Sequence, residues 1–109
     1  MKVFISLPHT GKSDEQIKKE MDFAIEQIKQ DYPCAEMIDS FITDSYIEAC
    51  ENAGTNLNIG LWYLGKSIEL LSQAKLAVFV NDWQEARGCI IEHQAATAYG
   101  IPVLQINTP

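Results

Sequence analysis

The sequence predicts a single α/β domain built around a mostly parallel sheet. Short apolar runs typical of buried strands alternate with amphipathic, helix-like segments along the 109 residues. Parallel strands require crossover connections, which helices supply while they cover the faces of the sheet. No Pro-, Gly- or Ser-rich stretch and no block of charge divides the chain. We therefore expect one domain over residues 1–109, with about four strands flanked by helices.

The first half of the chain is expected to contain two strands and two helices. Residues 2–7 form a short apolar run that ends at Pro8, the usual pattern of a buried first strand. Ser13 stands three residues before Gln16, a capping-box spacing, so a helix is expected to begin there. Two further candidates follow, a strand over residues 34–38 and a short helix over residues 44–53.

The second half of the chain carries the clearest strand. Leucine and isoleucine recur at helical intervals over residues 61–73, and the unbroken apolar run 76–80 follows. A helix over residues 89–99 is closed by Gly100, and residues 103–106 form the last expected strand.

Charge and cysteine content restrict the class of partner. The net charge of −7 opposes binding to a nucleic-acid backbone or an anionic lipid surface, although backbone amides can still bind a small anion locally. The odd set Cys34, Cys50 and Cys89 has no CxxC spacing, which fits neither a disulfide framework nor a zinc site. Nothing resembles a signal peptide or a membrane span. We expect a cytoplasmic protein that needs no metal and no cofactor.

The fold class alone indicates where a ligand would bind. In an open parallel sheet the crevice lies outside the carboxyl ends of the strands, where the strand order reverses. The loops concerned begin at four places, Leu7-Pro8, Asp39-Ser40, Asn81-Asp82 and Asn107. The helix that opens at Gly88 adds its backbone amides to this edge.

Glu92 is the residue at this edge best placed for chemistry. It lies four residues after Gly88, so its carboxylate can point back over the strand ends. The small residues Ala95, Ala96 and Ala98 allow the helix to approach the sheet closely, which would partly enclose the acid. Such a carboxylate can act as a nucleophile on an anomeric carbon or as a general base. A solvated helix acid is the ordinary alternative.

Residues 6–13 end in the Gly-Lys-Ser of a phosphate-binding P-loop. The segment has Ser6 where that loop needs its first glycine, and Pro8 stiffens a turn whose amides should wrap phosphate. An ordinary strand-to-helix loop capped by Ser13 is therefore the favoured interpretation.

The remaining candidate side chains have structural interpretations. His9 and His93 lack a third spaced ligand, so structural or solvent roles are favoured over metal binding. Cys89 has no matching histidine constellation, and core packing is favoured. Trp62 and Tyr63 fit a core or an interface, whereas Trp83, after the clearest strand, is equally suited to stacking on a nucleobase.

The block from Gly88 to Pro102 reads Gly-Cys-Ile-Ile-Glu-His-Gln-Ala-Ala-Thr-Ala-Tyr-Gly-Ile-Pro. With the preceding Leu-Ala-Val-Phe-Val run and the opening Val-Phe-Ile-Ser-Leu-Pro, it resembles the nucleoside 2-deoxyribosyltransferase-like family. The resemblance implies a flavodoxin-like, Rossmann-like fold and cleavage of the bond between a base and a deoxyribose. It further implies that a glutamate nucleophile, here Glu92, forms a covalent glycosyl intermediate, and that a neighbouring subunit can complete the site.

Other residues at the strand ends are candidates for further roles in the crevice. Asp82, or Glu85 in the same loop, is a candidate proton donor or orienting group. The remaining ligand-binding candidates are Ser6, Pro8, Ser67, Trp83, Gly88 and Asn107.

Three functions stay open at this stage. The first is an enzyme that hydrolyses or transfers the N-glycosidic bond of a nucleoside or nucleotide. The family's enzymes generally have aspartate where this chain has Ser67, and a tyrosine where it has Phe4. These departures favour the second function, a module that binds a nucleotide-like molecule without chemistry. The third is a protein-binding scaffold. Exposed aromatic residues would also suit a homo-oligomer.

Overall fold

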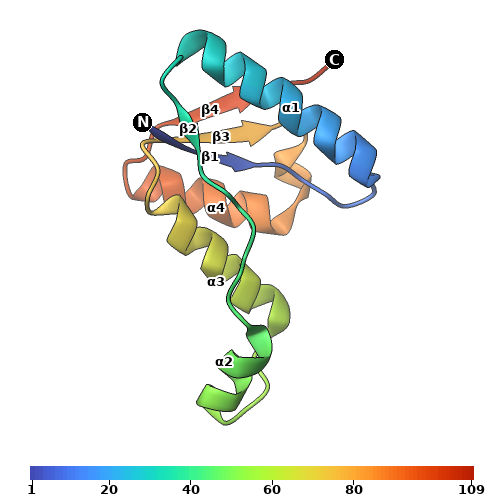
Figure 1. The fold of residues 1–109 in the computed structure, drawn as a ribbon, viewed down its shortest axis with the longest axis vertical. Coiled ribbons are helices and arrows are strands. Elements are labelled where there is room, and N and C mark those ends of the chain that lie inside the picture. The colour runs from blue at the N-terminus through green and yellow to red at the C-terminus, as the bar shows by residue number, and fades with distance from the viewer.

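The protein is an α/β domain with a four-stranded, all-parallel sheet in the order β2-β1-β3-β4 (Figure 1). The computed structural model describes all of residues 1–109. The strands are β1 (Lys2–Ser6), β2 (Glu36–Met37), β3 (Leu76–Val80) and β4 (Val103–Ile106). Because β2 and β3 lie on opposite sides of β1, the strand order reverses between β1 and β3. The predicted fold class, a flavodoxin-like or Rossmann-like arrangement, is confirmed.

Four α-helices connect the strands. They are α1 (Asp14–Asp31), α2 (Tyr46–Ala53), α3 (Ile59–Leu71) and α4 (Arg87–Ala98), with a short 3₁₀ turn, η1 (Trp83–Glu85), before α4. Ser13 caps α1 as its sequence spacing predicts, since its hydroxyl accepts a hydrogen bond from the Gln16 amide at 3.2 Å. The predicted strand at residues 34–38 is shorter than expected, because only Glu36 and Met37 pair with β1.

Two separate cores hold the layers together. Helix α1 covers one face of the sheet, and α3 and α4 cover the other (Figure 1). Val3, Val78 and Ile28 are buried between the sheet and α1, whereas Phe79 and Ala96 are buried on the opposite face. Every residue of β3 is buried, which explains why this strand reads as an unbroken apolar run. Strand β3 therefore contributes side chains to both cores.

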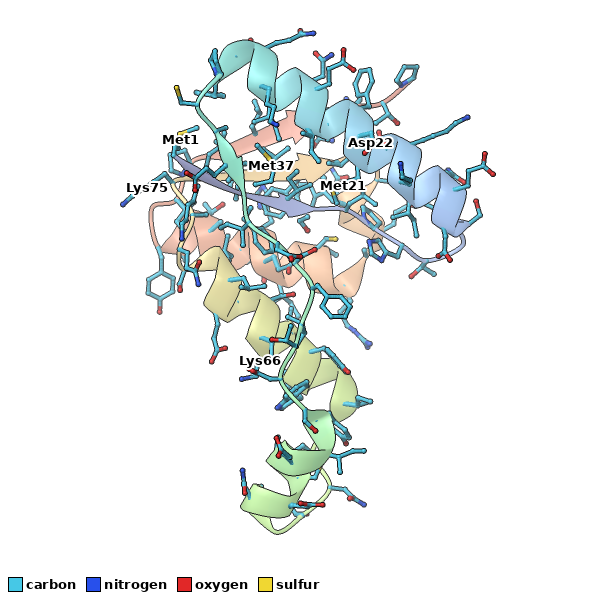
Figure 2. All side chains as sticks on the ribbon, viewed as in Figure 1. Met1, Met21, Asp22, Met37, Lys66 and Lys75 are labelled. Carbon is cyan, nitrogen blue, oxygen red and sulfur yellow. The ribbon has the colours of Figure 1, made fainter.

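Helix α2 and the start of α3 extend away from the sheet as an arm (Figure 1). Trp62 packs edge-on against Tyr46 and Tyr63, with ring centroids 5.6 and 4.9 Å apart, and joins the two helices. Figure 2 shows the side chains of this arm extending outward without a covering element. Its exposed apolar side chains include Ile47, Ile59 and Leu61, and Phe41 is exposed in the segment before α2.

None of the helices has the length and apolar character that crossing a membrane would require.

Candidate functional site

Glu92 is buried at the carboxyl end of the sheet, although it is an acid. It projects from α4 and is 7% exposed. The hydroxyl of Ser6, the last residue of β1, donates a hydrogen bond of 2.8 Å to Glu92 Oε1. The two residues are 86 positions apart in the sequence. Glu92 is therefore not a solvated helix acid, which is the alternative that the sequence leaves open.

A cavity of about 180 Å³ lies beside this carboxylate. Its wall is contributed by β1 and the loop after it, by α1, α3 and α4, and by the segment after β2. The polar lining consists of Ser6, His9, Ser40, Ser67 and Glu92, and the Cys89 thiol also contributes to the wall. The cavity is smaller than the roughly 300–1,000 Å³ of pockets that hold drug-sized ligands. Its volume admits only a small ligand or one part of a larger ligand.

The surroundings of Glu92 change its acidity. Burial raises the pKa of its carboxyl group above the ordinary 4.5, and the hydroxyls of Ser6 and Ser67 oppose this rise by hydrogen bonding. Burial likewise raises the pKa of the neighbouring Cys89 thiol, with the Ser6 hydroxyl acting against it and Glu92 adding to it. Cys89 therefore stays a neutral thiol at physiological pH, as its predicted packing role requires.

The structure brings several of the expected site residues together around Glu92. Ser6 and Ser67 line the same cavity. Pro8 is buried at the end of β1 next to the lining residues Leu7 and His9, although it is not itself part of the lining. Gly88 lies in the first turn of α4, where an added Cβ would be 4.0 Å from a methyl group of Leu64. Gly88 thus has room for a small side chain and is not required by close packing.

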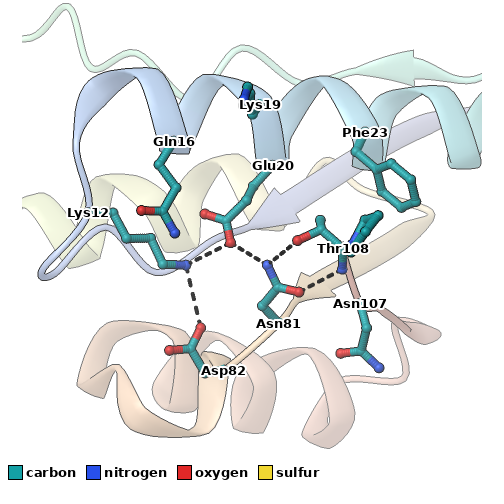
Figure 3. A pocket seen from close by; sticks show the side chains of 10 residues that line it. Lys12, Gln16, Lys19, Glu20, Phe23, Asn81, Asp82, Asn107 and Thr108 are labelled. Atoms are coloured by element: carbon teal, nitrogen blue, oxygen red, sulfur yellow. Dashed lines mark hydrogen bonds and ion pairs between the residues drawn. The ribbon is translucent and has the colours of Figure 1, made fainter.

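Asp82 lies apart from the Glu92 cavity. It lines a second, larger pocket of about 840 Å³ together with Asn107 (Figure 3). Its carboxylate lies 3.4 Å from the Lys12 ammonium and is half exposed. A hydrogen bond to its own backbone amide, with Lys12 in addition, holds the pKa of Asp82 below 3.8. An acid that remains ionised and faces another cavity is poorly suited to protonate a departing base at Glu92.

The indole ring of Trp83 is already paired with side chains of the protein. It stacks on His93 with ring centroids 4.1 Å apart and an interplanar angle of 11°. Its Nε1–H donates a 2.7 Å hydrogen bond to Gln105 Oε1. One face and the polar edge of the ring are thus engaged, and His93 has the structural role that its sequence position favours.

Sequence reasoning missed the cluster around Lys12 and Glu20. Lys12 lies 3.1 Å from Glu20 Oε1, and both side chains are 9% exposed. Asn81, which follows β3, donates from its side-chain amide to Glu20 and, at 2.9 Å, to Thr108 Oγ1. The left-handed backbone of Asn81, with φ of 55°, is a conformation that asparagine tolerates well. The sequence gives little sign of this cluster, because Glu20 reads as one of several helix acids.

No group of three or more histidine, cysteine, aspartate or glutamate side chains is arranged to hold a metal ion.

Comparisons of the chain with protein-family models, with curated proteins and with solved structures found no match.

Proposed function

We propose that the protein cleaves the N-glycosidic bond of a nucleoside or nucleotide, with Glu92 as the nucleophile. The observation that carries the proposal is the buried Glu92 carboxylate, hydrogen-bonded to Ser6 and facing a cavity of about 180 Å³ at the strand ends. Enclosed carboxylates with a shifted pKa in a cavity are typical of catalytic sites. The resemblance to nucleoside 2-deoxyribosyltransferases supplies the class of reaction.

The proposed chemistry proceeds in two steps. A Glu92 carboxylate oxygen attacks the anomeric carbon, and the base departs with the electron pair of the C–N bond and takes up a proton. The resulting glycosyl ester is then opened by water, which gives hydrolysis, or by a second base, which gives transfer. In both cases Glu92 regains its charge.

Ser6 and Ser67 act as positioning residues in this proposal. The Ser6 hydroxyl bonds to Oε1 at 2.8 Å and so holds the carboxylate beside the cavity. Both hydroxyls oppose the pKa rise caused by burial and so favour the ionised carboxylate that a nucleophile needs.

A binding module without chemistry is the second candidate function. The observation in its favour is that the cavity lining contains no second carboxylic acid, while Asp82 pairs with Lys12 elsewhere. A departing base would then have to take its proton from His9 or from solvent. A protein that only binds a nucleotide-like molecule needs no proton donor.

We also propose that the protein forms a homo-oligomer. The arm formed by α2 and the start of α3 exposes Ile47, Ile59 and Leu61, which are 69, 56 and 66% exposed, and Phe41 in the segment before α2 is 76% exposed. Apolar side chains gathered on one projection are typical of an interaction surface. A second copy would cover them.

The experiment compares wild-type protein with Glu92→Gln, which keeps the side-chain shape and removes the nucleophile. Each is incubated with a panel of nucleosides, nucleotides and NAD, with and without a free acceptor base, and analysed by liquid chromatography and mass spectrometry. Release or exchange of base by wild type is expected, with at least about a 10³-fold loss in Glu92→Gln.

The mass of the quenched protein provides a second readout. Wild type should carry a sugar-sized adduct that is absent from Glu92→Gln. Turnover that survives in Glu92→Gln would exclude the mechanism. An intact ligand retained in stoichiometric amount, without released base, would instead favour the binding module.

A further inference from the structure

The lining of the Glu92 cavity limits the source of the proton that a departing base needs. The ionisable side chains of this lining are His9, Cys89 and Glu92. Glu92 is the nucleophile of the proposed chemistry, and burial raises the pKa of the Cys89 thiol above 9.0, which makes it a weak acid. Asp82 lines the other pocket and pairs with Lys12 at 3.4 Å. His9 is therefore the one ionisable side chain of the lining that is still without a role.

The loop that carries His9 is anchored on both sides of this residue. Pro8, immediately before it, is buried and has a fixed φ. The His9 carbonyl accepts a hydrogen bond of 3.1 Å from the Lys12 amide and closes a β-turn, in which Gly11 has a φ of 76° that favours glycine. The Lys12 ammonium ties the end of the turn to Glu20 on α1 at 3.1 Å. These contacts hold the backbone of His9 next to the cavity.

His9 and Glu92 line the same cavity but differ in their access to solvent. Glu92 is 7% exposed, whereas His9 belongs to the exposed residues of the chain. His9 follows Ser6 by three positions, and the Ser6 hydroxyl bonds to Glu92 at 2.8 Å, so the loop after β1 brings an imidazole to the cavity that the carboxylate faces. Imidazole is the side chain that gains and loses a proton near neutral pH. An imidazole that lines the cavity and also reaches water can regain its proton between turnovers.

We propose that His9 is the general acid of this site and protonates the departing base, an inference that rests on the proposed glycosidic chemistry of Glu92. A Glu92 oxygen bonds to the anomeric carbon while the C–N electron pair moves to the base. The imidazolium N–H proton passes to the base, which leaves a neutral imidazole. In the second step water, or an incoming base, gives its proton to that imidazole as the ester bond to Glu92 breaks. Both groups are thereby restored, and no further reactant is consumed.

A matched pair of nucleosides tests whether His9 supplies this proton. 2′-Deoxyguanosine needs a proton as its base departs, whereas 7-methyl-2′-deoxyguanosine has a cationic base that departs as a neutral molecule. Base release above the spontaneous rate is measured by liquid chromatography for wild type, His9→Gln and Glu92→Gln. His9→Gln should lower the rate for 2′-deoxyguanosine about 10²-fold, a typical contribution of a general acid, and the rate for the methylated nucleoside less than about threefold. Glu92→Gln should abolish release from both.

Rescue by added imidazole extends the test to any other nucleoside that wild type cleaves. Imidazole should raise the rate of His9→Ala at least about tenfold, because it replaces the missing proton donor. His93→Gln is the matched control and should keep the wild-type rate, since His93 stacks on Trp83 and does not line the cavity.

The outcomes separate the role of His9 from that of Glu92. A wild-type rate in His9→Gln, equal losses on the two deoxyguanosines, or, for a nucleoside without a methylated partner, no rescue of His9→Ala would overturn the role of His9 and leave that of Glu92 intact. If wild type releases no base from any nucleoside, the proposed function fails, and the role of His9 fails with it.

Discussion

Two glutamates are buried at the carboxyl end of the sheet, and their surroundings are opposite in kind. Glu92 has a neutral hydroxyl donor, Ser6, whereas Glu20 has the charged ammonium of Lys12 and the amide of Asn81. A carboxylate paired with an ammonium has its charge compensated and is held in place. A carboxylate that has only hydroxyl donors retains an uncompensated charge, which is the condition for nucleophilic attack.

Burial alone does not distinguish these two acids. Both side chains are less than one-tenth exposed, so the nature of the donor distinguishes the two. Glu20 links α1 to the segments that follow β3 and β4, because Asn81 donates hydrogen bonds to both Glu20 and Thr108. These interactions give Glu20 a structural role, although its Oε2 oxygen has no donor. Glu92 makes no ion pair, and the pKa of its carboxyl is raised by burial.

The largest stability effect is expected from Lys12→Met. This change leaves the buried Glu20 carboxylate without its ammonium, because only the Asn81 amide remains as a donor. We expect the free energy of unfolding at pH 7 to fall by about 2 kcal/mol. Chemical denaturation followed by circular dichroism measures the change.

A double-mutant cycle identifies the cause. Replacing Lys12 and Glu20 together with methionine should recover much of the loss, since no buried charge then remains unpaired. If the losses of unfolding free energy in the two single variants simply add in the double variant, Lys12 and Glu20 are not coupled. The structural role of this ion pair would then be excluded.

The sequence was sufficient to predict the fold because the periodic elements carry local signals. The unbroken apolar run Leu76–Val80 marks a strand buried on both faces, and Ser13 caps α1 at the residue that its spacing indicates. The weak strand at 34–38 shrinks to a two-residue pairing, since Glu36 and Met37 form only the edge of the sheet. Helical periodicity cannot show that α2 projects from the body, because this depends on long-range packing.

The candidate site was only partly predictable, because long-range packing decides which side chains come together. Glu92 and Ser6 could each be selected by the rule that ligands bind at strand ends, and the structure joins them across 86 positions. Asp82 was selected by the same rule, but the direction of a loop side chain depends on partners such as Lys12, which the sequence does not pair with it. The free Oε2 of Glu20 is likewise a property of three-dimensional contacts.

A smaller effect is expected from Ser6→Ala. The variant removes the 2.8 Å hydrogen bond to Glu92 and, with it, a group that lowers the pKa of the carboxyl. The free energy of unfolding at pH 7 should fall by about 1 kcal/mol, and the loss should shrink as the pH falls through the folded-state pKa of Glu92, which lies above 4.5, and the carboxylate becomes protonated. Denaturant titrations at both pH values measure it. Ser67→Ala is the matched control, with a smaller loss expected, and equal losses at both pH values would mean that the bond does not depend on the Glu92 charge.

The smallest effect expected is the pH-dependent stabilisation caused by Glu92→Gln. Since burial raises the folded-state pKa of Glu92 above 4.5, its contribution to stability is complete below that pH and is lost as the pH rises through the folded-state pKa. The neutral glutamine has no such loss. The variant should therefore be more stable than wild type at pH 7, with a difference that disappears in acid.

Thermal unfolding of wild type and Glu92→Gln across the range from pH 4 to pH 8 checks this expectation. Glu26→Gln, at an exposed position of α1, corrects for the change in net charge, because it removes one carboxylate without touching the cavity. A corrected stability difference that stays constant with pH, or that favours wild type at pH 7, would show that the Ser6 and Ser67 hydroxyls outweigh burial at Glu92. The hydrogen bonds of Glu92 would then stabilise its charged form, as the Lys12 ammonium stabilises that of Glu20. The two buried acids would differ in the geometry of their partners and not in the stability of their charge.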